Sequence, residues 1–176
     1  MCSSDLPETG AVTTPEVFKP IYSYLRDNGY IGITGDTEYG GGGAPETLGI
    51  AMGEMSSASN KSLAMCPGLT RGLVEALEAW GSDEQKQYYL PNLISGTWSG
   101  TMCLTEPQCG TDLGLVRTKA TPDGDAYKLT GTKIWITFGE HDLTDNIIHL
   151  VLARLPDAPE GIKGRSEEHT SELQSH

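Results

Sequence analysis

The chain has 176 residues, with 24 Asp and Glu against 12 Lys and Arg, and a formal net charge of −12 at pH 7. An acidic chain with scattered basic residues argues against nucleic acid and anionic membranes as partners. No apolar run reaches the roughly 18 residues that a membrane-spanning helix needs, so we expect no membrane span.

Both ends of the chain resemble translated sequencing adapter. Residues 165–176 (RSEEHTSELQSH) back-translate to a common short-read adapter, and residues 1–6 (MCSSDL) fit the reverse strand of the same oligonucleotide. Such segments are set aside before the fold is considered. We therefore expect residues 7–164 to be an internal piece of a longer gene, and residues 165–176 to take no part in the core.

Three cysteines lie between these ends, namely Cys66, Cys103 and Cys109. An odd number without C-x-x-C spacing indicates neither a disulfide framework nor a zinc site, and it favours a reducing compartment. His141 and His149 also lack the spacing that metal ligands use. We expect no metal site and give both histidines a hydrogen-bonded or surface role.

The N-terminal part of the chain carries helix signals. A first helix is predicted to begin at a Thr14 cap with Pro15 in its first position, and to end at 28–29. Its apolar stripe is predicted to consist of Val17, Ile21 and Leu25, with Phe18 and Tyr22 beside it. A second helix is predicted to follow the loop at 40–45. The run Gly40–Gly43 lacks the Lys-Ser/Thr of a phosphate loop and follows no strand, so we interpret it as an interhelical turn.

Two further helices are predicted before residue 97. One opens at Pro67 and ends at Gly81. Its buried face is predicted to be Leu69, Leu73, Leu77 and Trp80. The other starts with a capping box formed by Ser82 and Gln85, and ends at Gly96.

From residue 97 onward, helical periodicity gives way to short runs of β-branched and aromatic residues. Strands are predicted over 98–104, 115–121, 127–137 and 147–154, and residues 122–125 (PDGD) predict a hairpin turn. A helical block followed by a β block implies two packed domains instead of alternating βαβ units. The predicted fold class is therefore α+β.

Two segments of the β block carry the strongest chemical signal. Residues 101–112 (TMCLTEPQCGTD) indicate a strand that runs into a tight turn at Gly110, where backbone N–H groups and the hydroxyls of Thr105 and Thr111 can bond a ligand. Residues 133–137 (KIWIT) indicate an apolar β run that ends in an aromatic plate, Trp135, and a hydroxyl, Thr137. A planar heteroaromatic ligand with polar edges needs both a flat surface and donors at its rim.

The two segments together, with Trp135 placed 24 residues after Thr111, resemble the middle domain of flavin-dependent acyl-CoA dehydrogenases. The pattern of that family is T-E-P-x-x-G-[ST]-D followed by a W-I-T-like triplet. The resemblance implies a partial helical N-terminal domain over 7–97 and the start of an antiparallel β-barrel middle domain over 98–164. Segments 100–114, 139–142 (GEHD) and 149–159 resemble a larger bacterial subfamily that includes methylmercaptopropionyl-CoA dehydrogenase and carries a C-terminal extension.

The resemblance implies an oxidoreductase of fatty acid β-oxidation that uses FAD to convert an acyl-CoA thioester to the trans-2-enoyl-CoA. In this family a glutamate removes the α-proton while the β-hydrogen leaves as hydride to the flavin. That glutamate lies in the C-terminal helical domain, so we expect it beyond residue 164 and assign no catalytic residue here. The implied partners are acyl-CoA, an electron-transfer flavoprotein and further copies in a homodimer or homotetramer, in the cytoplasm of a bacterium.

The resemblance also assigns cofactor-binding residues, namely Met102, Leu104, Thr105, Gly110, Thr111, Trp135, Ile136 and Thr137. It implies that Thr105 bonds the pyrimidine edge of the flavin, that Trp135 packs on the ring and that Thr137 lies near N5. It places Gly110 and Thr111 against the flavin, its phosphates or the substrate. Thr111 stands where many family members have serine, so the hydroxyl is retained.

Three alternatives stay open at this point. An acyl-CoA oxidase would share this half of the flavin site but deliver its electrons to oxygen. A non-catalytic flavin-binding relative that binds DNA would carry a basic patch, whereas this segment is acidic. A flavin-free binding module would require both motifs to be accidental. We expect the 176-residue chain by itself to bind flavin weakly and not to turn over acyl-CoA.

Overall fold

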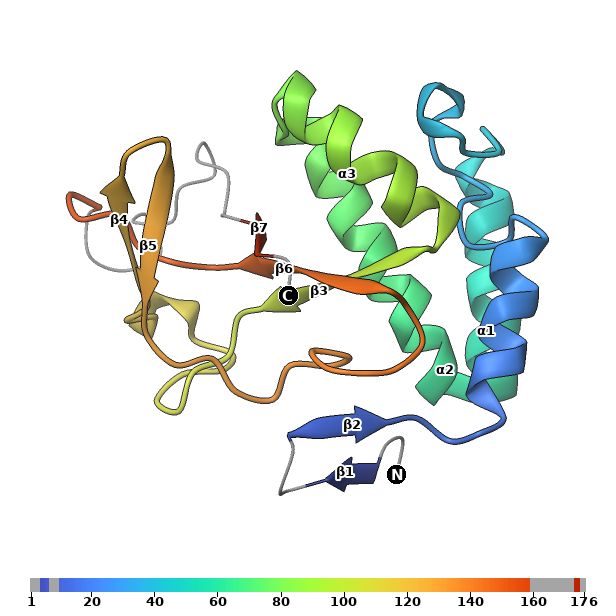
Figure 1. The fold of residues 1–176 in the computed structure, drawn as a ribbon, viewed down its shortest axis with the longest axis horizontal. Helices are drawn as coiled ribbons and strands as arrows, with labels where there is room; N and C mark the ends of the chain where they lie inside the picture. Colours follow the sequence, from blue (N-terminus) through green and yellow to red (C-terminus); the bar gives the residue numbers. More distant parts are fainter. Residues whose placement is uncertain (1–3, 7–9, 159–172, 175–176) are drawn as a thin grey trace.

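The computed structural model describes residues 4–6, 10–158 and 173–174 (Figure 1). Its helices are α1 (Phe18–Asp27), α2 (Glu46–Trp80) and α3 (Asp83–Ser95), with 3-10 turns η1 (Thr37–Tyr39) and η2 (Leu113–Leu115). Its strands are β1 (Ser4–Leu6), β2 (Ala11–Thr13), β3 (Trp98–Cys103), β4 (Lys119–Asp123), β5 (Ala126–Thr130), β6 (Asn146–Val151) and β7 (Leu173–Gln174). The three α-helices precede residue 97 and strands β3–β7 follow it, which confirms the α+β class.

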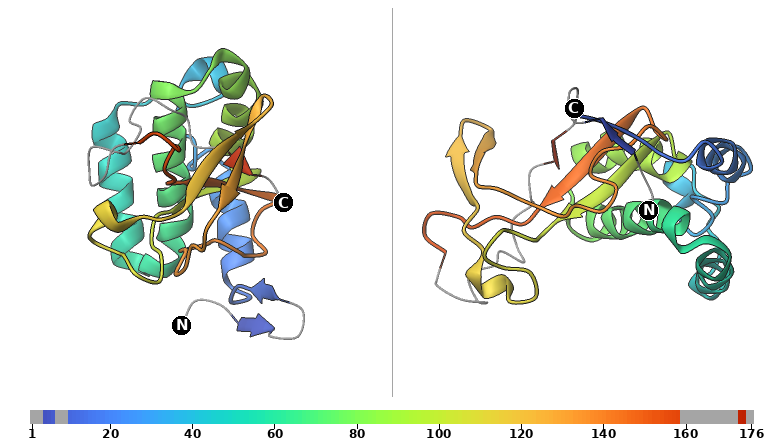
Figure 2. Two further views of the ribbon diagram at one scale, coloured as in Figure 1. Left: turned by 90° about the vertical axis from the view of Figure 1, so that its left-hand side faces the viewer. Right: turned by 90° about the horizontal axis from the view of Figure 1, so that it is seen from below.

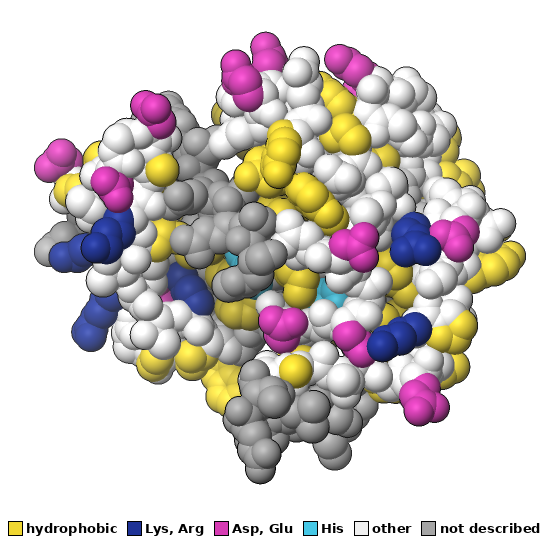
Figure 3. All heavy atoms as spheres, in the orientation of Figure 1, with side chains coloured by type: hydrophobic (Ala, Val, Ile, Leu, Met, Phe, Trp, Pro, Cys, Tyr) yellow, Lys and Arg dark blue, Asp and Glu magenta, His cyan; other side chains and the backbone are white. Residues whose placement is uncertain are grey.

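The chain has a helical end and a hairpin end, with a pair of strands between them (Figure 1). The helices lie at one end, the β4–β5 hairpin lies at the other, and β3 and β6 run between them (Figures 1 and 2). Acidic side chains are spread over the visible face, on the helices and on the hairpin alike (Figure 3).

Helix α1 begins later than the Thr14 signal predicts. Its N-cap is Val17, which makes no side-chain capping hydrogen bond. Thr14 instead donates its N–H and its hydroxyl to the Asp142 carboxylate, at 2.9 and 2.7 Å. The predicted stripe is also wrong, because Val17 is exposed whereas Phe18 and Tyr22 are buried. The Thr14 hydroxyl therefore bonds a carboxylate that is remote in sequence and does not cap the helix.

Helix α2 consists of two helical segments joined at a kink. Asn60 has non-helical backbone angles (φ −155°, ψ 91°), and its side-chain oxygen accepts a hydrogen bond from the Leu63 N–H at 3.1 Å. This is the geometry of an N-cap, so the second segment starts at Asn60. The prediction that a helix opens at Pro67 is therefore wrong, and Pro67 lies inside α2.

The buried face of the second segment of α2 overlaps only in part with the predicted one. Its buried residues are Leu63, Cys66, Thr70, Leu73, Val74 and Leu77. Leu73 and Leu77 were predicted, but Leu69 is half-buried and Trp80 is 69% exposed. Leu73 packs directly on β3, since a methyl group at Gly100 would overlap its side chain. Glycine at that position lets the helix approach the strand.

Two loop predictions around the helices are confirmed. The Ser82 N–H donates to Gln85 Oε1 at 2.9 Å and the Gln85 N–H donates to Ser82 Oγ at 3.2 Å, which is the capping box that opens α3. Gly96 ends α3 with a φ of 77°. The run Gly40–Gly43 is an interhelical turn whose N–H groups donate to carbonyls of residues 32–37, so these donors are satisfied within the turn.

The strands form separate pairs. The predicted PDGD hairpin is confirmed, since β4 and β5 pair antiparallel around Gly124, whose φ is 64°. Strands β3 and β6 pair in parallel, from Trp98 opposite Asn146 to Cys103 opposite Val151. The parallel pairing differs from the antiparallel barrel that was expected. A long connection, residues 104–145, separates the two strands and brings the chain back in the same direction, as parallel pairing requires.

The predicted strand over 127–137 is wrong beyond Thr130, where β5 ends. Residues 131–138 form a loop in which Trp135 and Phe138 have φ values of 60° and 52°. Positive φ lies outside the range of a strand. Alternation of apolar residues predicted a strand, but tertiary hydrogen bonds, described below, set this backbone.

Two short strands involve the ends that we expected to be non-native. Ser4–Leu6 pairs with β2, and Leu173–Gln174 pairs with β6 at Leu150 and His149. The backbone of β7 thus pairs with the edge of β6, whereas the expectation that residues 165–176 take no part in the core depends on side chains outside the described residues and stays a prediction. An open strand edge accepts almost any extended segment, so this pairing needs no sequence signal.

Two buried clusters tie helices to strands. The first joins α2 and α3 to β6 through Leu73, Val74, Leu77, Leu90, Leu93, Ile94 and Ile148. The second joins α1 and α2 to the loop before β6 through Phe18, Tyr22, Leu63, Cys66 and Leu143. Because each cluster contains a residue from the β block, the helical block and the β block pack against each other through both clusters.

Candidate functional site

Strand β3 carries the first motif segment to a turn. Glu106 and Cys109 exchange both of their backbone hydrogen bonds, at 2.8 and 3.0 Å. The tight turn is therefore centred on residues 107–108, with Pro107 in the position that proline favours. The prediction of the turn at Gly110 is wrong by two to three residues, and Gly110 lies in an exposed bend after it.

The second motif segment is a loop that presents Trp135. The side chain of Trp135 is 85% exposed and its backbone φ is 60°. A bulky residue in the left-handed region costs on the order of 1–3 kcal/mol, and such residues gather at ligand sites. Trp135 combines this strain with a large exposed aromatic surface, so it is the strongest marker of a site in the described chain.

Hydrogen bonds hold the two segments together. The Ile134 N–H donates to the Thr105 carbonyl at 3.0 Å. The Thr101 hydroxyl donates to the Thr137 carbonyl at 2.7 Å. Trp135 thus follows directly after a residue that is bonded to Thr105, and a flat ring and a hydroxyl from distant parts of the sequence share one neighbourhood.

A buried carboxylate lies beneath this contact. Glu106 is 3% exposed. It accepts hydrogen bonds from the backbone N–H groups of Arg117 and Thr118, at 2.7 and 3.0 Å, and from the Gln108 amide at 2.5 Å. These bonds tie the 107–108 turn to the chain that enters β4.

Lys133 completes this arrangement. Its ammonium lies 2.9 Å from Glu106 Oε1 and donates to the Leu104 carbonyl at 3.0 Å, and its side chain is 10% exposed. Burial alone would raise the pKa of the Glu106 carboxyl, but hydrogen bonds from Thr118, Lys133 and the Arg117 backbone lower it to about 2. The Glu106 carboxyl is therefore ionised at neutral pH, where it faces the Lys133 side chain.

The predicted site residues are placed unequally. Thr105, Ile136 and Thr137 are half-buried around the contact between the segments, as is Leu104. Met102 is 37% exposed on β3. Gly110 and Thr111 are exposed beyond the turn, and no hydrogen bond among the described residues joins them to the Trp135 loop.

Sequence reasoning missed Glu106 and Lys133 as functional residues. Both lie inside the quoted motifs, Glu106 in T-E-P and Lys133 directly before I-W-I-T. The first segment contains two acids, Glu106 and Asp112, and the second contains one base, Lys133. A pairing between the segments was therefore an available signal, because buried charges are usually paired. The spacing in the sequence gave no way to see that the two meet.

His141 has the hydrogen-bonded role predicted for it. It is 6% exposed; its Nδ1 accepts from the Leu143 N–H at 3.1 Å, and its Nε2 lies 2.9 Å from Ser99 Oγ. Because Nδ1 accepts, Nε2 carries the proton in the neutral ring. Burial, opposed by Asp142, lowers the pKa of His141 to about 4. This neutral histidine fixes the loop before β6 against β3.

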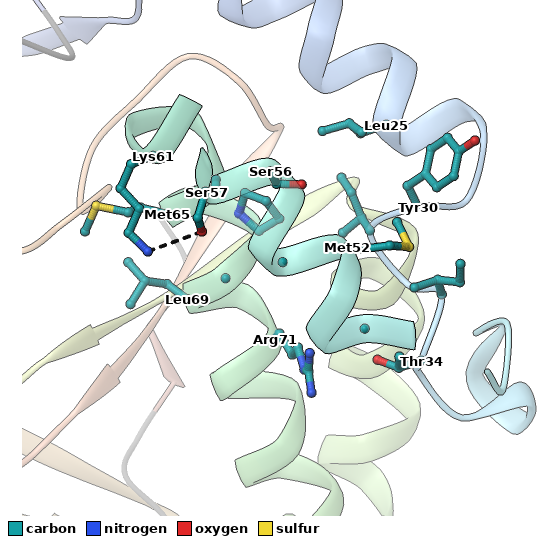
Figure 4. A pocket seen from close by; sticks show the side chains of 17 residues that line it. Leu25, Tyr30, Thr34, Met52, Ser56, Ser57, Lys61, Met65, Leu69 and Arg71 are labelled. Atoms are coloured by element: carbon teal, nitrogen blue, oxygen red, sulfur yellow. Dashed lines mark hydrogen bonds between the residues drawn. The ribbon is translucent and has the colours of Figure 1, made fainter. Parts of the chain in front are cut away.

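A cavity of about 380 Å³ opens between α1, the loop after it and both segments of α2 (Figure 4). Its apolar lining includes Leu25, Tyr30, Ile31, Met52, Met65 and Leu69. Lys61 and Ser57, linked at 3.4 Å, add polar groups to the wall. This volume falls within the range of small-molecule sites.

The same helix connects the cavity with the first motif. The second segment of α2 lines the cavity with Met65 and Leu69. One step around the helix, Thr70 Oγ1 accepts a hydrogen bond from the Gly100 N–H of β3 at 3.0 Å. The strand that leads into Thr105 is therefore attached to the far side of the cavity wall.

Neither a metal centre nor a membrane helix stands out in residues 4–6, 10–158 and 173–174. No group of three or more His, Cys, Asp and Glu side chains is arranged to hold a metal ion within those residues. No helix there is both long and apolar enough to cross a bilayer. The cysteines Cys66, Cys103 and Cys109 are free thiols and buried.

Comparison with known proteins decides the family. The family model for the acyl-CoA dehydrogenase N-terminal domain matches residues 7–97. The chain belongs to the acyl-CoA dehydrogenase family. It is 51% identical over 160 residues to the 3-methylmercaptopropionyl-CoA dehydrogenase of Ruegeria pomeroyi, covering 90% of this chain and 27% of that protein.

Solved structures of acyl-CoA dehydrogenases share its fold. One from Geobacillus kaustophilus superposes with a TM-score of 0.72 at 27% identity, over 90% of this chain and 39% of that one. An acyl-CoA dehydrogenase from Bacillus anthracis, solved in complex with FAD, gives a TM-score of 0.67 at 28% identity, over 78% and 24% of the two chains. This chain therefore spans well under half the length of these relatives.

Proposed function

We propose that this chain supplies one half of the FAD site in an acyl-CoA dehydrogenase that converts an acyl-CoA thioester to a trans-2-enoyl-CoA. One observation carries the proposal. The exposed, left-handed Trp135 is held beside Thr105 by the bond from the Ile134 N–H to the Thr105 carbonyl. Family membership supplies the reaction class, and the local geometry supplies the site.

The residues present fit a flavin. Trp135 offers an exposed, flat aromatic surface for stacking against an isoalloxazine ring. The hydroxyls of Thr105 and Thr111 make no hydrogen bond among the described residues, so both can serve a ligand edge. Met102 offers apolar surface on the neighbouring strand. We assign these residues, with Leu104, Gly110, Ile136 and Thr137, to flavin binding, and Thr111 also to the substrate.

Bound FAD would supply an acceptor for the β-hydrogen of the thioester. The work of this chain is to orient that cofactor: Trp135 supports its ring, and the Thr105 hydroxyl bonds its edge. We assign the removal of the α-proton to a glutamate outside this chain, since no glutamate here matches the family position. Without that base, positioned proton transfer worth about 10²–10⁴-fold is missing.

We assign the apolar acyl group to the cavity between α1 and α2. Its lining is largely aliphatic and thioether, and Met65 and Leu69 stand on the helix whose other side contacts β3. Substitution of Leu69 by Trp would narrow this cavity. The expected result is a raised KM for long acyl-CoAs with little change for short ones, and equal effects on both would remove this assignment.

The acceptor of the electrons is proposed to be an electron-transfer flavoprotein, and the complete protein is proposed to be an oligomer located in the bacterial cytoplasm. These proposals rest on the family. An acyl-CoA oxidase is distinguished by rapid reoxidation of the reduced protein by oxygen. The measurement is the reoxidation rate in air compared with that in the presence of an electron-transfer flavoprotein.

A chimera tests the proposal. Residues 7–164 replace the matching segment of the Ruegeria pomeroyi relative, which is 51% identical and supplies the rest of an enzyme. We expect the FAD-loaded chimera to lose flavin absorbance on anaerobic addition of 3-methylmercaptopropionyl-CoA or butyryl-CoA. The unmodified relative is the positive control, and the 176-residue chain by itself is expected to show no bleaching. A folded, FAD-loaded chimera that no acyl-CoA bleaches would contradict the proposal.

A further inference from the structure

We propose that the Glu106–Lys133 pair is a positioning device that fixes the two flavin-facing segments against each other. This inference rests on the proposed function for its purpose. Its geometry stands on the contacts of the pair alone. Neither residue is offered as touching substrate or cofactor, so both act through Thr105 and Trp135.

Two neighbouring residues of the second segment join it to the first. Lys133 donates its ammonium to the Leu104 carbonyl at 3.0 Å, and the next residue, Ile134, donates its N–H to the Thr105 carbonyl at 3.0 Å. Two consecutive residues of one segment thus bond two consecutive carbonyls of the other. Trp135 follows immediately, so its place relative to Thr105 is set by this double contact.

Lys133 is held by the Glu106 carboxylate. Its ammonium is nearly buried and lies 2.9 Å from Glu106 Oε1. The Glu106 side chain is itself 3% exposed. Glu106 also accepts the backbone N–H groups of Arg117 and Thr118. These two bonds hold the carboxylate on the side where the chain enters β4. The pair therefore bridges three stretches of chain, at 104–109, 117–118 and 133–134.

The backbone at Trp135 needs an anchor of this kind. Trp135 occupies a left-handed backbone conformation, which persists only where the surroundings over-determine it. The exposed Trp135 side chain adds little packing that would hold its backbone in this conformation. The Glu106 carboxylate and the Lys133 ammonium beneath the loop provide this constraint, because removing either one leaves the other buried without its charge partner.

The test uses the full 176-residue chain with Glu106→Gln and Lys133→Gln, each close in shape to the original residue. The matched controls are Glu140→Gln and Lys128→Gln, which change exposed residues nearby. The first readout is hydrogen exchange at the Ile134 amide, measured by NMR without any flavin. The second readout is the affinity for FAD of the same variants in the chimera described above, measured by quenching of flavin fluorescence.

We expect exchange at Ile134 to accelerate about tenfold or more in both pair variants, as follows from losing a charge-assisted hydrogen bond, and to stay unchanged in the controls. FAD affinity should fall by a similar factor. Unchanged Ile134 exchange in a folded variant overturns the positioning role. So does global loss of the helical circular dichroism signal in both variants, since the pair would then serve general stability. If the apo chimera that carries residues 7–164 binds no FAD while the exchange effect holds, the proposed function fails and the positioning survives.

Discussion

Two carboxylates of similar acidity, Glu106 and Asp142, hold different parts of this molecule. Asp142 accepts two hydrogen bonds from Thr14 and lies 2.7 Å from the Lys19 ammonium, so it ties the start of the helical block to the loop before β6. Burial opposes ionisation at both sites, yet hydrogen bonds lower both pKa values to about 2, from Lys19 and Thr14 at Asp142.

The two sites differ in their exposure to solvent. The Glu106 and Lys133 side chains are 3% and 10% exposed, whereas those of Asp142 and Lys19 are 24% and 54% exposed. Water screens the second pair and replaces its lost bonds when it is broken. Equal pKa values therefore do not imply equal contributions to the free energy of unfolding, and burial decides which pair the fold depends on.

The largest effect is expected for Glu106→Ala. This change leaves the Lys133 ammonium nearly buried without a charge partner and removes the acceptor of two backbone N–H groups. The free energy of unfolding should fall by about 3–5 kcal/mol. Urea titration followed by circular dichroism measures it. A loss no larger than that of an exposed control such as Glu140→Ala would show that water already reaches this pair.

The next largest effect is expected from mild acid acting on His141. The pKa of His141 is depressed to about 4 from 6.5, so the unfolded chain binds the proton first. Stability is complete above pH 6.5 and falls as the pH drops towards 4, by up to about 3 kcal/mol. Both carboxylates retain their contribution above their ordinary pKa values and lose it only as the pH falls towards 2.

Acid should therefore loosen the Asp142 region before the Glu106 region. The measurement is the urea midpoint at pH 6.5 and at pH 4.7, in the parent and in His141→Gln. The parent should lose stability over this interval, and the variant should show a flat profile. A parallel decline in both would assign the acid sensitivity to another group.

Asp142→Ala comes third. It removes the acceptor of the Thr14 N–H and hydroxyl, at a partly exposed position, and should cost about 1–3 kcal/mol. Asp142→Asn keeps one oxygen for Thr14 and should recover part of the loss. Thermal unfolding by circular dichroism compares the three proteins. If Asp142→Ala matches Glu106→Ala, the contrast between the two sites is mistaken.

The smallest effect is expected for Lys19→Met. Its partner Asp142 keeps both bonds from Thr14, and the lysine is more than half exposed, so the change should cost about 0.2–1 kcal/mol. Lys133→Met, in contrast, should cost several times more. Both are measured by urea titration at low and at high salt, and salt should shrink the Lys19 effect while leaving the Lys133 effect in place.

Features that depend on neighbours in the sequence could be predicted. The capping box of Ser82 and Gln85 and the hairpin at Gly124 follow from a few adjacent residues, and both are present. The helix-to-strand change near residue 97 follows from a change in period. The two motifs were found from their residue types, and the structure places part of them side by side.

Features set by distant partners could not be predicted. Thr14 has the sequence of a helix cap, but Asp142 takes its hydroxyl. Pro67 looks like a helix start, whereas Asn60 provides the cap. The loop at Trp135 has the alternation of a strand, but the bonds of Ile134 and Lys133 to the first motif fix its backbone. In each case a side chain or carbonyl remote in sequence outweighs local propensity.

The most direct test of the flavin site is calorimetric titration of FAD into the apo form of the chimera that carries residues 7–164. The proposed site predicts one FAD per subunit. It also predicts affinity that falls about tenfold or more in Thr105→Val, which removes a ligand hydrogen bond, and again in Trp135→Ala. The control Thr132→Val, an exposed position in the same loop, should bind FAD as the parent does. A folded chimera that binds no FAD, or Thr105 and Trp135 variants that bind it as tightly as the parent, would contradict the account.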